Sequence, residues 1–334
     1  MPHVGQILDA LTRCALQGSA GREEGGDIKD ARLAQTVTSQ WRPGGCLRGD
    51  PAGLTCGMKL VLAAVALAFC RAALGQAPSS ARATGETTAL TIPSKTYPQG
   101  RLVWIYTPPG YPASCQGACN TIIAFDGALY LGAMALPSIL DSLIAVRATP
   151  PAVAVLIDNG GPPGRIRDLA NSQQFAAFVG DELLPWLRDH YVVTRAPAKV
   201  VLAGVSAGGL AAAYIAMKYP SLFGRVLSQS GAFWRGNEAS DGPPYEWLTQ
   251  HVASSPRSSI TFFIDVGTRE TVGALGGRAP SLLDANRRLS SALIEKGYAA
   301  QYFEVPGGAH SPETWHTRLP QGIVALLPVQ SAER

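Results

Sequence analysis

The segment Gly204-Val205-Ser206-Ala207-Gly208 has the G-x-S-x-G spacing that surrounds many serine nucleophiles. An apolar segment, 200–203, runs into it, and an alanine-rich segment, 210–217, runs out of it. A strand, a sharp turn and a helix in this order expose a serine hydroxyl above the edge of a sheet. Glycines flank the turn because a Cβ there would collide with the strand or the helix. The pattern predicts Ser206 as a nucleophile for acyl transfer rather than part of an ordinary glycine-rich turn.

A nucleophilic serine needs a general base, which is most often histidine. His310 follows the predicted strand 301–305 and the turn 306–309, so it should lie at the sheet edge that carries Ser206. His316, in the predicted last helix, is the alternative. The remaining histidines do not follow a predicted strand; they are His3, His190 and His251.

The base should in turn be oriented by a carboxylate. Glu270 is our choice, because it lies in the loop after the predicted strand 260–265, at the same sheet edge. Asp265 ends that strand and is the rival, although a structural hydrogen bond could explain it, and Asp284 in the next helix ranks third. The order serine, acid, histidine is that of the α/β-hydrolases.

The oxyanion formed by serine attack needs two preorganised N–H donors. We expect one from the backbone of Ala207, directly after the nucleophile. The other should follow an earlier strand, and the backbone of Ala128, after the predicted strand 121–125, is the candidate.

Strand-like and helix-like segments alternate along most of the chain. The predicted strands are 88–92, 101–106, 121–125, 152–157, 200–203, 260–265 and 301–305, and the predicted helices are 134–146, 172–187, 207–218, 282–296 and a last one ending near 327. Such alternation predicts one α/β domain over residues 84–328, with a mostly parallel central sheet flanked by helices on both faces and an antiparallel start. Segment 235–259 should be an irregular excursion over the rim of the sheet.

Composition excludes several classes of protein. Hydrophobic residues make up 46% of the 334 residues and charged residues 16%, which indicates a globular chain. The net charge is only +4 and no basic run contains interleaved aromatics, so we expect no nucleic-acid partner. The histidines do not form a spaced ligand set, so we expect no metal site. Nothing in the sequence indicates a protein partner.

Residues 58–77 resemble a cleaved signal peptide, with Met58-Lys59, an apolar run over 60–69, and Ala73 and Gly75 at the −3 and −1 positions. The run is too short for a stable membrane span. We therefore expect a periplasmic or secreted protein, and we interpret residues 1–57 as a disordered leader from a mis-assigned start. Two cysteines follow this region, Cys115 and Cys119, and they are a candidate disulfide.

Several motifs together resemble one known family. They are Trp104-Ile105-Tyr106-Thr107-Pro108-Pro109-Gly110-Tyr111, Phe125-Asp126-Gly127, Leu227-Ser228-Gln229-Ser230-Gly231-Ala232-Phe233-Trp234, and Gly307-Gly308-Ala309-His310. The chain resembles the enterochelin-esterase-like branch of the esterase D family, in the α/β-hydrolase superfamily, over residues 84–328. The resemblance implies hydrolysis of a small-molecule ester without a cofactor, with Ser206, His310 and an acid at Glu270. Some members of the family function with a Ser-His dyad, and Ala309 adds one residue to the usual Gly-Gly-His spacing.

The substrate is the part on which the sequence is least informative. Phe233 and Trp234 are candidates for a pocket that accepts an aromatic group, or they pack the excursion. Arg165 either contacts an anionic substrate or is solvated. The resemblance favours a siderophore trilactone ester; feruloyl or acetyl esters of polysaccharides, or acyl transfer of the antigen 85 type, are the alternatives. A non-catalytic binding protein is disfavoured because the nucleophile and base are both retained.

Overall fold

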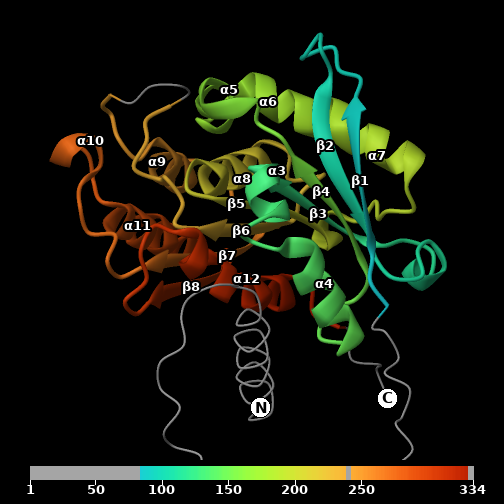
Figure 1. Ribbon diagram of the computed structural model, residues 1–334. Helices are drawn as coiled ribbons and strands as arrows, with labels where there is room; N and C mark the ends of the chain where they lie inside the picture. Colours follow the sequence, from blue (N-terminus) through green and yellow to red (C-terminus); the bar gives the residue numbers. More distant parts are fainter. Residues whose placement is uncertain (1–82, 238–241, 330–334) are drawn as a thin grey trace, which may run out of the picture. The chain divides into compact units, whose positions relative to one another are not determined.

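A computed structural model describes residues 83–237 and 242–329, so the predictions for the leader 1–57 and the signal peptide 58–77 lie outside the described residues. Within these ranges eight strands form one sheet in the order β1-β2-β4-β3-β5-β6-β7-β8 (Figure 1). Their bounds are β1 Glu86–Ile92, β2 Arg101–Thr107, β3 Asn120–Phe125, β4 Ala152–Ile157, β5 Val200–Val205, β6 Arg225–Gln229, β7 Thr261–Gly267 and β8 Ala299–Val305.

Strand β2 runs antiparallel to its neighbours β1 and β4, and all other neighbouring strands are parallel. The carboxyl ends of β3 to β8 therefore meet at one edge of the sheet, where loops can bring distant residues together. This topology confirms the prediction of an α/β-hydrolase fold with an antiparallel start.

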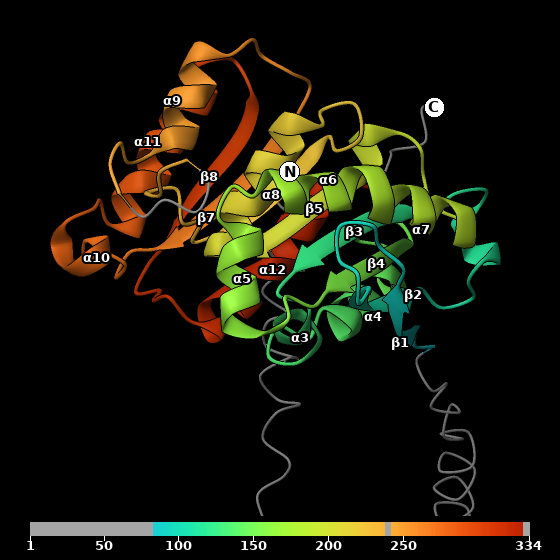
Figure 2. The ribbon, with the colours of Figure 1, turned by 90° about the horizontal axis from the view of Figure 1, so that it is seen from above.

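Helices cover both faces of the sheet, as the two views show (Figures 1 and 2). One face packs against α4 and α12, and the other against α6, α7, α8, α9 and α11. Their bounds are α3 Gly127–Leu131, α4 Leu136–Ala145, α5 Gly161–Leu169, α6 Gln173–Ala177, α7 Leu184–His190, α8 Ala207–Lys218, α9 Trp247–Ser254, α10 Ala274–Gly277, α11 Leu282–Glu295 and α12 Pro312–Leu326. Short 3-10 turns cover Ala113–Cys115 and Pro197–Lys199, and a π-helical segment, Phe178–Leu183, joins α6 to α7.

The central strands are buried on both faces because a strand alternates its side chains between them. In β3, Ile123 and Phe125 belong to one core cluster, while Ile122 and Ala124 belong to the other. Burial of all six residues of β3, β4 and β5 explains why these strands are largely apolar in the sequence, with Asn120 and Thr121 at the start of β3 as the polar exceptions.

Besides the short helices α3 and α10, which the sequence analysis does not predict, four elements differ from the sequence-based expectation. Strand β6 was not expected because Ser228 and Gln229 interrupt its apolar pattern, although both are buried. Helix α5 begins Gly-Pro-Pro-Gly, which suggests a turn, but proline is tolerated in the first turn of a helix. Helix α9 lies within the excursion predicted to be irregular. The single helix predicted over 172–187 contains the π-helical segment and extends to His190.

Candidate active site

The predicted nucleophile lies on a strained turn between β5 and α8. Ser206 has φ 55° and ψ −120°, a backbone conformation that L-residues rarely adopt. Its N–H donates to the carbonyl of Gln229 at 2.9 Å, which ties the turn to the end of β6. A Cβ on Gly204 would lie 2.2 Å from the backbone of Gly208, so only glycine allows strand and helix to approach this closely. The geometry is that of a nucleophile elbow.

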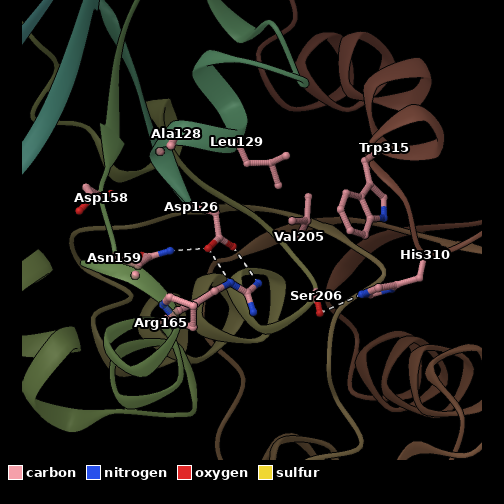
Figure 3. Close-up of a pocket in the computed structure, with 13 residues that line it drawn as sticks. Asp126, Ala128, Leu129, Asp158, Asn159, Arg165, Val205, Ser206, His310 and Trp315 are labelled. Carbon is pink, nitrogen blue, oxygen red and sulfur yellow. Dashed lines mark hydrogen bonds and ion pairs between the residues drawn. The ribbon is translucent and has the colours of Figure 1, made fainter.

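The predicted base faces this serine across the cleft (Figure 3). His310 Nε2 lies 3.1 Å from Ser206 Oγ, within hydrogen-bond reach for proton transfer. His310 lies in the loop between β8 and α12, after the positive-φ turn at Gly307. The predicted placement after strand 301–305 thus brings the two side chains together although 104 residues separate them.

Glu270 orients the imidazole. Its Oε2 accepts from His310 Nδ1 at 2.6 Å, and its side chain is only 2% exposed. The loops that carry Glu270 and His310 are joined directly, because the N–H of Arg269 donates to the carbonyl of Gly308 at 2.9 Å. A Cβ on Gly267 would lie 2.4 Å from that same carbonyl oxygen, so glycine is needed where the loops touch.

The two rival acids lie elsewhere. Asp265 is fully buried on β7, where its Oδ2 accepts from the side-chain amide of Gln229 at 3.1 Å. The pKa of Asp265 is raised to about 7, mainly by burial and to a smaller extent by the nearby carboxylate of Glu270, while the hydrogen bond from Gln229 and the charge of Arg318 lower it. Asp284 is half-exposed and accepts from the hydroxyl of Ser281 at 2.7 Å, at the start of α11.

The other described histidines have different partners. His316, the alternative base, has its Nδ1 3.1 Å from the carbonyl of Met134. His190 stacks on Trp186, and His251 stacks on Trp247. The structure therefore brings His310, and not these three, to Ser206.

The two candidate oxyanion donors lie in the first turns of helices, where backbone N–H groups have no acceptor within the helix. Ala207 is the first residue of α8 and Ala128 is the second residue of α3. Ala128 lines the same cleft as Ser206 (Figure 3). The helix N-termini also favour developing negative charge at this position.

Asp126 holds the turn before Ala128 in place. It has φ 61°, and its carboxylate accepts two hydrogen bonds from Arg165, from Nε at 2.6 Å and Nη2 at 2.9 Å. The side-chain amide of Asn159 donates to the same carboxylate (Figure 3). The Arg165 side chain is 30% exposed and lines the cleft, so it is not fully solvated and its predicted contact with an anionic substrate stays a prediction.

These groups surround a cleft of about 480 Å³ at the carboxyl edge of the sheet. Its lining combines polar residues, Asp126, Asp158, Asn159 and Arg165, with apolar residues, Leu129, Pro162, Val205 and Trp315. Ser206 and His310 line the same cleft, so a bound ester would meet both kinds of residue.

The two aromatic residues predicted to contact substrate are not part of this cleft. Phe233 is completely buried in the core, and Trp234 is 9% exposed. Both follow the turn after β6, which directs them into the helix layer instead of toward Ser206. The alternative interpretation, that these residues pack the excursion, matches their position.

Three further features of the described residues bear on the site and its surroundings. Cys115 and Cys119 are joined by a disulfide bond. Within residues 83–237 and 242–329, no group of three or more His, Cys, Asp or Glu side chains could hold a metal ion. In the same part of the chain, no helix has the length and apolarity needed to cross a membrane.

Comparison with known proteins shows the family. Residues 94–326 match the profile of the Esterase family, described as "Putative esterase". The iron(III) enterobactin esterase of Escherichia coli O6:H1 (strain CFT073) is 31% identical over 229 residues, which cover 68% of this chain and 53% of that protein. The chain belongs to this esterase family, and it spans about half the length of the curated relatives it matches.

Solved structures agree with this assignment. The enterochelin esterase from Shigella flexneri superimposes with a TM-score of 0.62 at 28% identity, over 72% of this chain and 58% of that one. An IroE-like serine hydrolase from Shewanella oneidensis has a TM-score of 0.60 at 21% identity, over 72% and 80%, a likeness of fold alone. The resemblance to enterochelin esterases inferred from the motifs is confirmed.

Two parts of the site were not identified from the sequence. One is the cluster of Asp126, Asn159 and Arg165, and the other is the pair Ser230 and Trp315 beside Glu270. Asp126, Asn159 and Ser230 each lie within two residues of the carboxyl end of a parallel strand, a position that could have drawn attention to them.

Proposed function

We propose that the chain is a serine-dependent carboxylic ester hydrolase with the catalytic triad Ser206, His310 and Glu270. The continuous series of contacts from Ser206 Oγ through the imidazole to the Glu270 carboxylate, at 3.1 Å and 2.6 Å, carries this proposal. Membership of the esterase family supports it independently.

The geometry accounts for a two-step reaction. Ser206 Oγ attacks the ester carbonyl carbon while His310 Nε2 takes its proton, and the resulting oxyanion accepts hydrogen bonds from the N–H groups of Ala128 and Ala207. Collapse of this intermediate breaks the bond to the alcohol, which leaves with the proton from His310. Water then attacks the acyl-enzyme, giving its proton to His310, and the acid is released as Ser206 regains its hydrogen.

For the substrate we propose a siderophore ester. Relatives at 31% and 30% identity are named iron(III) enterobactin esterases, and the cleft is lined by both polar and apolar residues. A small-molecule ester with hydrogen-bonding groups and flat apolar parts would suit such a lining.

The test is a comparison of the purified chain with its Ser206→Ala variant. Both are assayed with short-chain p-nitrophenyl esters and with enterobactin, feruloyl and acetyl esters. We expect the purified chain to hydrolyse at least one of these esters. Ser206→Ala should do so at least about 10³-fold more slowly, because removing the nucleophile leaves only binding and the oxyanion donors. Equal rates for the two proteins would overturn the assignment of Ser206. The ester that is hydrolysed fastest decides between a siderophore ester and a polysaccharide ester as the substrate.

Acyl transfer is tested in the same assay. Adding an acceptor alcohol to a hydrolase diverts part of the acyl-enzyme, whereas a transferase needs the acceptor for most of its turnover. We expect substantial hydrolysis with water alone.

We also propose export to the periplasm or the medium, from the signal-like segment 58–77. The N-terminus of the protein recovered from the periplasm or medium of a bacterial host should begin after Gly75. Protein confined to the cytoplasm, with this segment still attached, would contradict the proposal.

A further inference from the structure

Ser230 occupies an unusual position directly behind the proposed triad. It is the first residue after β6, is completely buried, and has φ 49°, a conformation uncommon for a residue other than glycine. Its N–H donates to the carbonyl of Asp265 at 2.7 Å, and two residues later the N–H of Ala232 donates to the carbonyl of Ser206 at 2.9 Å. The strained turn is thus tied both to β7 and to the nucleophile.

The hydroxyl of Ser230 joins two other buried groups. It donates to Glu270 Oε1 at 2.6 Å and accepts from the indole Nε1 of Trp315 at 2.9 Å. The indole N–H can only donate, and a serine hydroxyl has one hydrogen. With Trp315 donating to it, the hydroxyl must direct its own hydrogen at the carboxylate.

These contacts determine which hydrogen bonds each oxygen of the Glu270 carboxylate accepts. Its Oε1 accepts both from Ser230 and from the N–H of Gly267, the latter at 2.8 Å. The other oxygen, Oε2, accepts from His310 Nδ1. Three donors held by β7, the β6 turn and the loop of the base therefore determine the orientation of one carboxylate.

Trp315 also contacts the base itself. Its ring meets the His310 imidazole edge to face, with the centroids 4.9 Å apart and the planes at 90°. Trp315 is held in turn, because the side-chain amide of Gln229 donates to its carbonyl at 2.9 Å. One side chain thus constrains the triad at two points, through the Ser230 hydroxyl and through the imidazole plane.

We propose that Ser230 and Trp315 are positioning residues of the triad, which act in series to set the rotamer of Glu270 and the plane of His310. This inference rests on the proposed serine mechanism. Neither residue exchanges a proton with the substrate. Their effect is to hold the hydrogen bond from His310 to Glu270 in one geometry while the imidazole gains and loses its other proton.

The test compares Ser230→Ala with Ser228→Ala. Ser228 is a matched control, because it lies on β6 two residues before Ser230, is equally buried, and its hydroxyl has no hydrogen-bond partner among the described residues. We expect Ser230→Ala to lower kcat about 10- to 100-fold, the factor that a hydrogen bond to a charged group is worth, with KM little changed. Ser228→Ala should keep kcat within about twofold, as expected where no hydrogen bond is lost.

A second readout requires no turnover. A proton held between imidazole and carboxylate gives a proton NMR resonance at low field, and His310→Ala identifies the resonance by removing it. We expect this resonance to shift or broaden in Ser230→Ala and to stay in place in Ser228→Ala. Trp315→Phe keeps a ring against His310 but loses the donor, and it should produce a smaller change in the same direction.

Because the two residues act in series, the double variant should be no slower than the more impaired of the two single variants. Normal kcat and an unmoved resonance in Ser230→Ala would overturn the proposal, as would fully additive losses in the double variant. If Ser230→Ala does not fold, Trp315→Phe tests the proposal alone, through its kcat and the position of the low-field resonance. If the wild-type chain hydrolyses no ester, the proposed function fails, and the resonance still decides whether these residues position His310.

Discussion

The two halves of the cleft are built on different principles. On the side of the base, hydrogen bonds from His310 and from Ser230, which itself accepts from Trp315, converge on Glu270, and the acid is 2% exposed. On the side of the oxyanion donors, a bidentate ion pair between Asp126 and Arg165 lines the cleft, and the Arg165 side chain is 30% exposed. In the first half the acid is shielded from water while the His310 side chain is 38% exposed; in the second half Asp126 is shielded and Arg165 is partly exposed.

The difference follows from what each half must do. A base that gains and loses a proton needs a fixed tautomer and a carboxylate sheltered from water, where hydrogen bonds to a charge are strong. Oxyanion donors are backbone N–H groups, so side chains can only help by holding the turn that presents them. An ion pair with one buried and one partly exposed partner suffices for that purpose, because the fold already supplies most of the constraint. We therefore expect substitutions in the base half to be more damaging.

The largest effect expected in this comparison is that of Glu270→Gln. The glutamine side chain is neutral, so it accepts the hydrogen bond from His310 without the negative charge of the carboxylate. It also allows the imidazole to adopt the wrong tautomer for a general base. By analogy with other triads we expect kcat to fall about 10³- to 10⁴-fold while the protein stays folded. Steady-state kinetics together with a thermal melt would check this.

Asp284→Asn is the matched control for Glu270→Gln, since its carboxylate is half-exposed and belongs to the start of α11. It should leave kcat unchanged. A loss of activity in Glu270→Gln of less than about tenfold would mean that Ser206 and His310 act as a dyad, because a triad acid is worth far more.

A smaller effect is expected on the oxyanion side, from Arg165→Lys. Lysine keeps the charge but cannot make the bidentate contact with Asp126. If Arg165 positions the turn before Ala128, Arg165→Lys and Arg165→Met should both lower kcat about 10- to 100-fold, less than loss of a whole oxyanion donor. If Arg165 instead binds an anionic part of the substrate, Arg165→Lys should keep most activity and Arg165→Met should mainly raise KM.

The fold was predictable where one physical rule governs a segment. Strands β3, β4 and β5 are largely apolar because both their faces are buried, and helix α8 follows directly from the glycine-flanked elbow. Strand β6 is not predicted because it carries the polar residues Ser228 and Gln229, which are buried only through tertiary contacts. Helix α5 is not predicted because its two prolines are compatible with the first turn of a helix as well as with a loop.

The same distinction holds for the site. Ser206, His310 and Glu270 could be placed because each follows a strand at one edge of the sheet, so topology alone brings them together. The substrate residues could not be placed, because the direction of a side chain after a strand depends on the turn. Phe233 enters the core, since the strained turn at Ser230 reverses the chain into the helix layer. Pairing of Arg165 with Asp126 also required the three-dimensional structure.

The base half contains a second carboxylate, Asp265, that differs from Glu270 in its partners. Glu270 accepts from three donors, whereas Asp265 Oδ2 accepts from Gln229 and its Oδ1 is buried without a partner among the described residues. Burial raises the pKa of Asp265 from its usual 3.8 to about 7. The folded state therefore binds a proton that the unfolded state releases between about pH 4 and pH 7. The free energy of unfolding must therefore fall as the pH rises through this window, and the loss of stability is complete above pH 7.

Asp265→Asn should remove this cost without impairing the triad. The displacement of the pKa corresponds to at most about 4 kcal/mol, so we expect a Tm about 5–10 °C above that of the wild type at pH 8. At pH 4 the two proteins should melt at nearly the same temperature, because Asp265 is then protonated in both the folded and much of the unfolded state. Asp189→Asn, at an exposed carboxylate, should show no such dependence. A destabilised Asp265→Asn variant at pH 8, or one with kcat lowered as far as in Glu270→Gln, would show that the charge on Asp265 serves the base half after all.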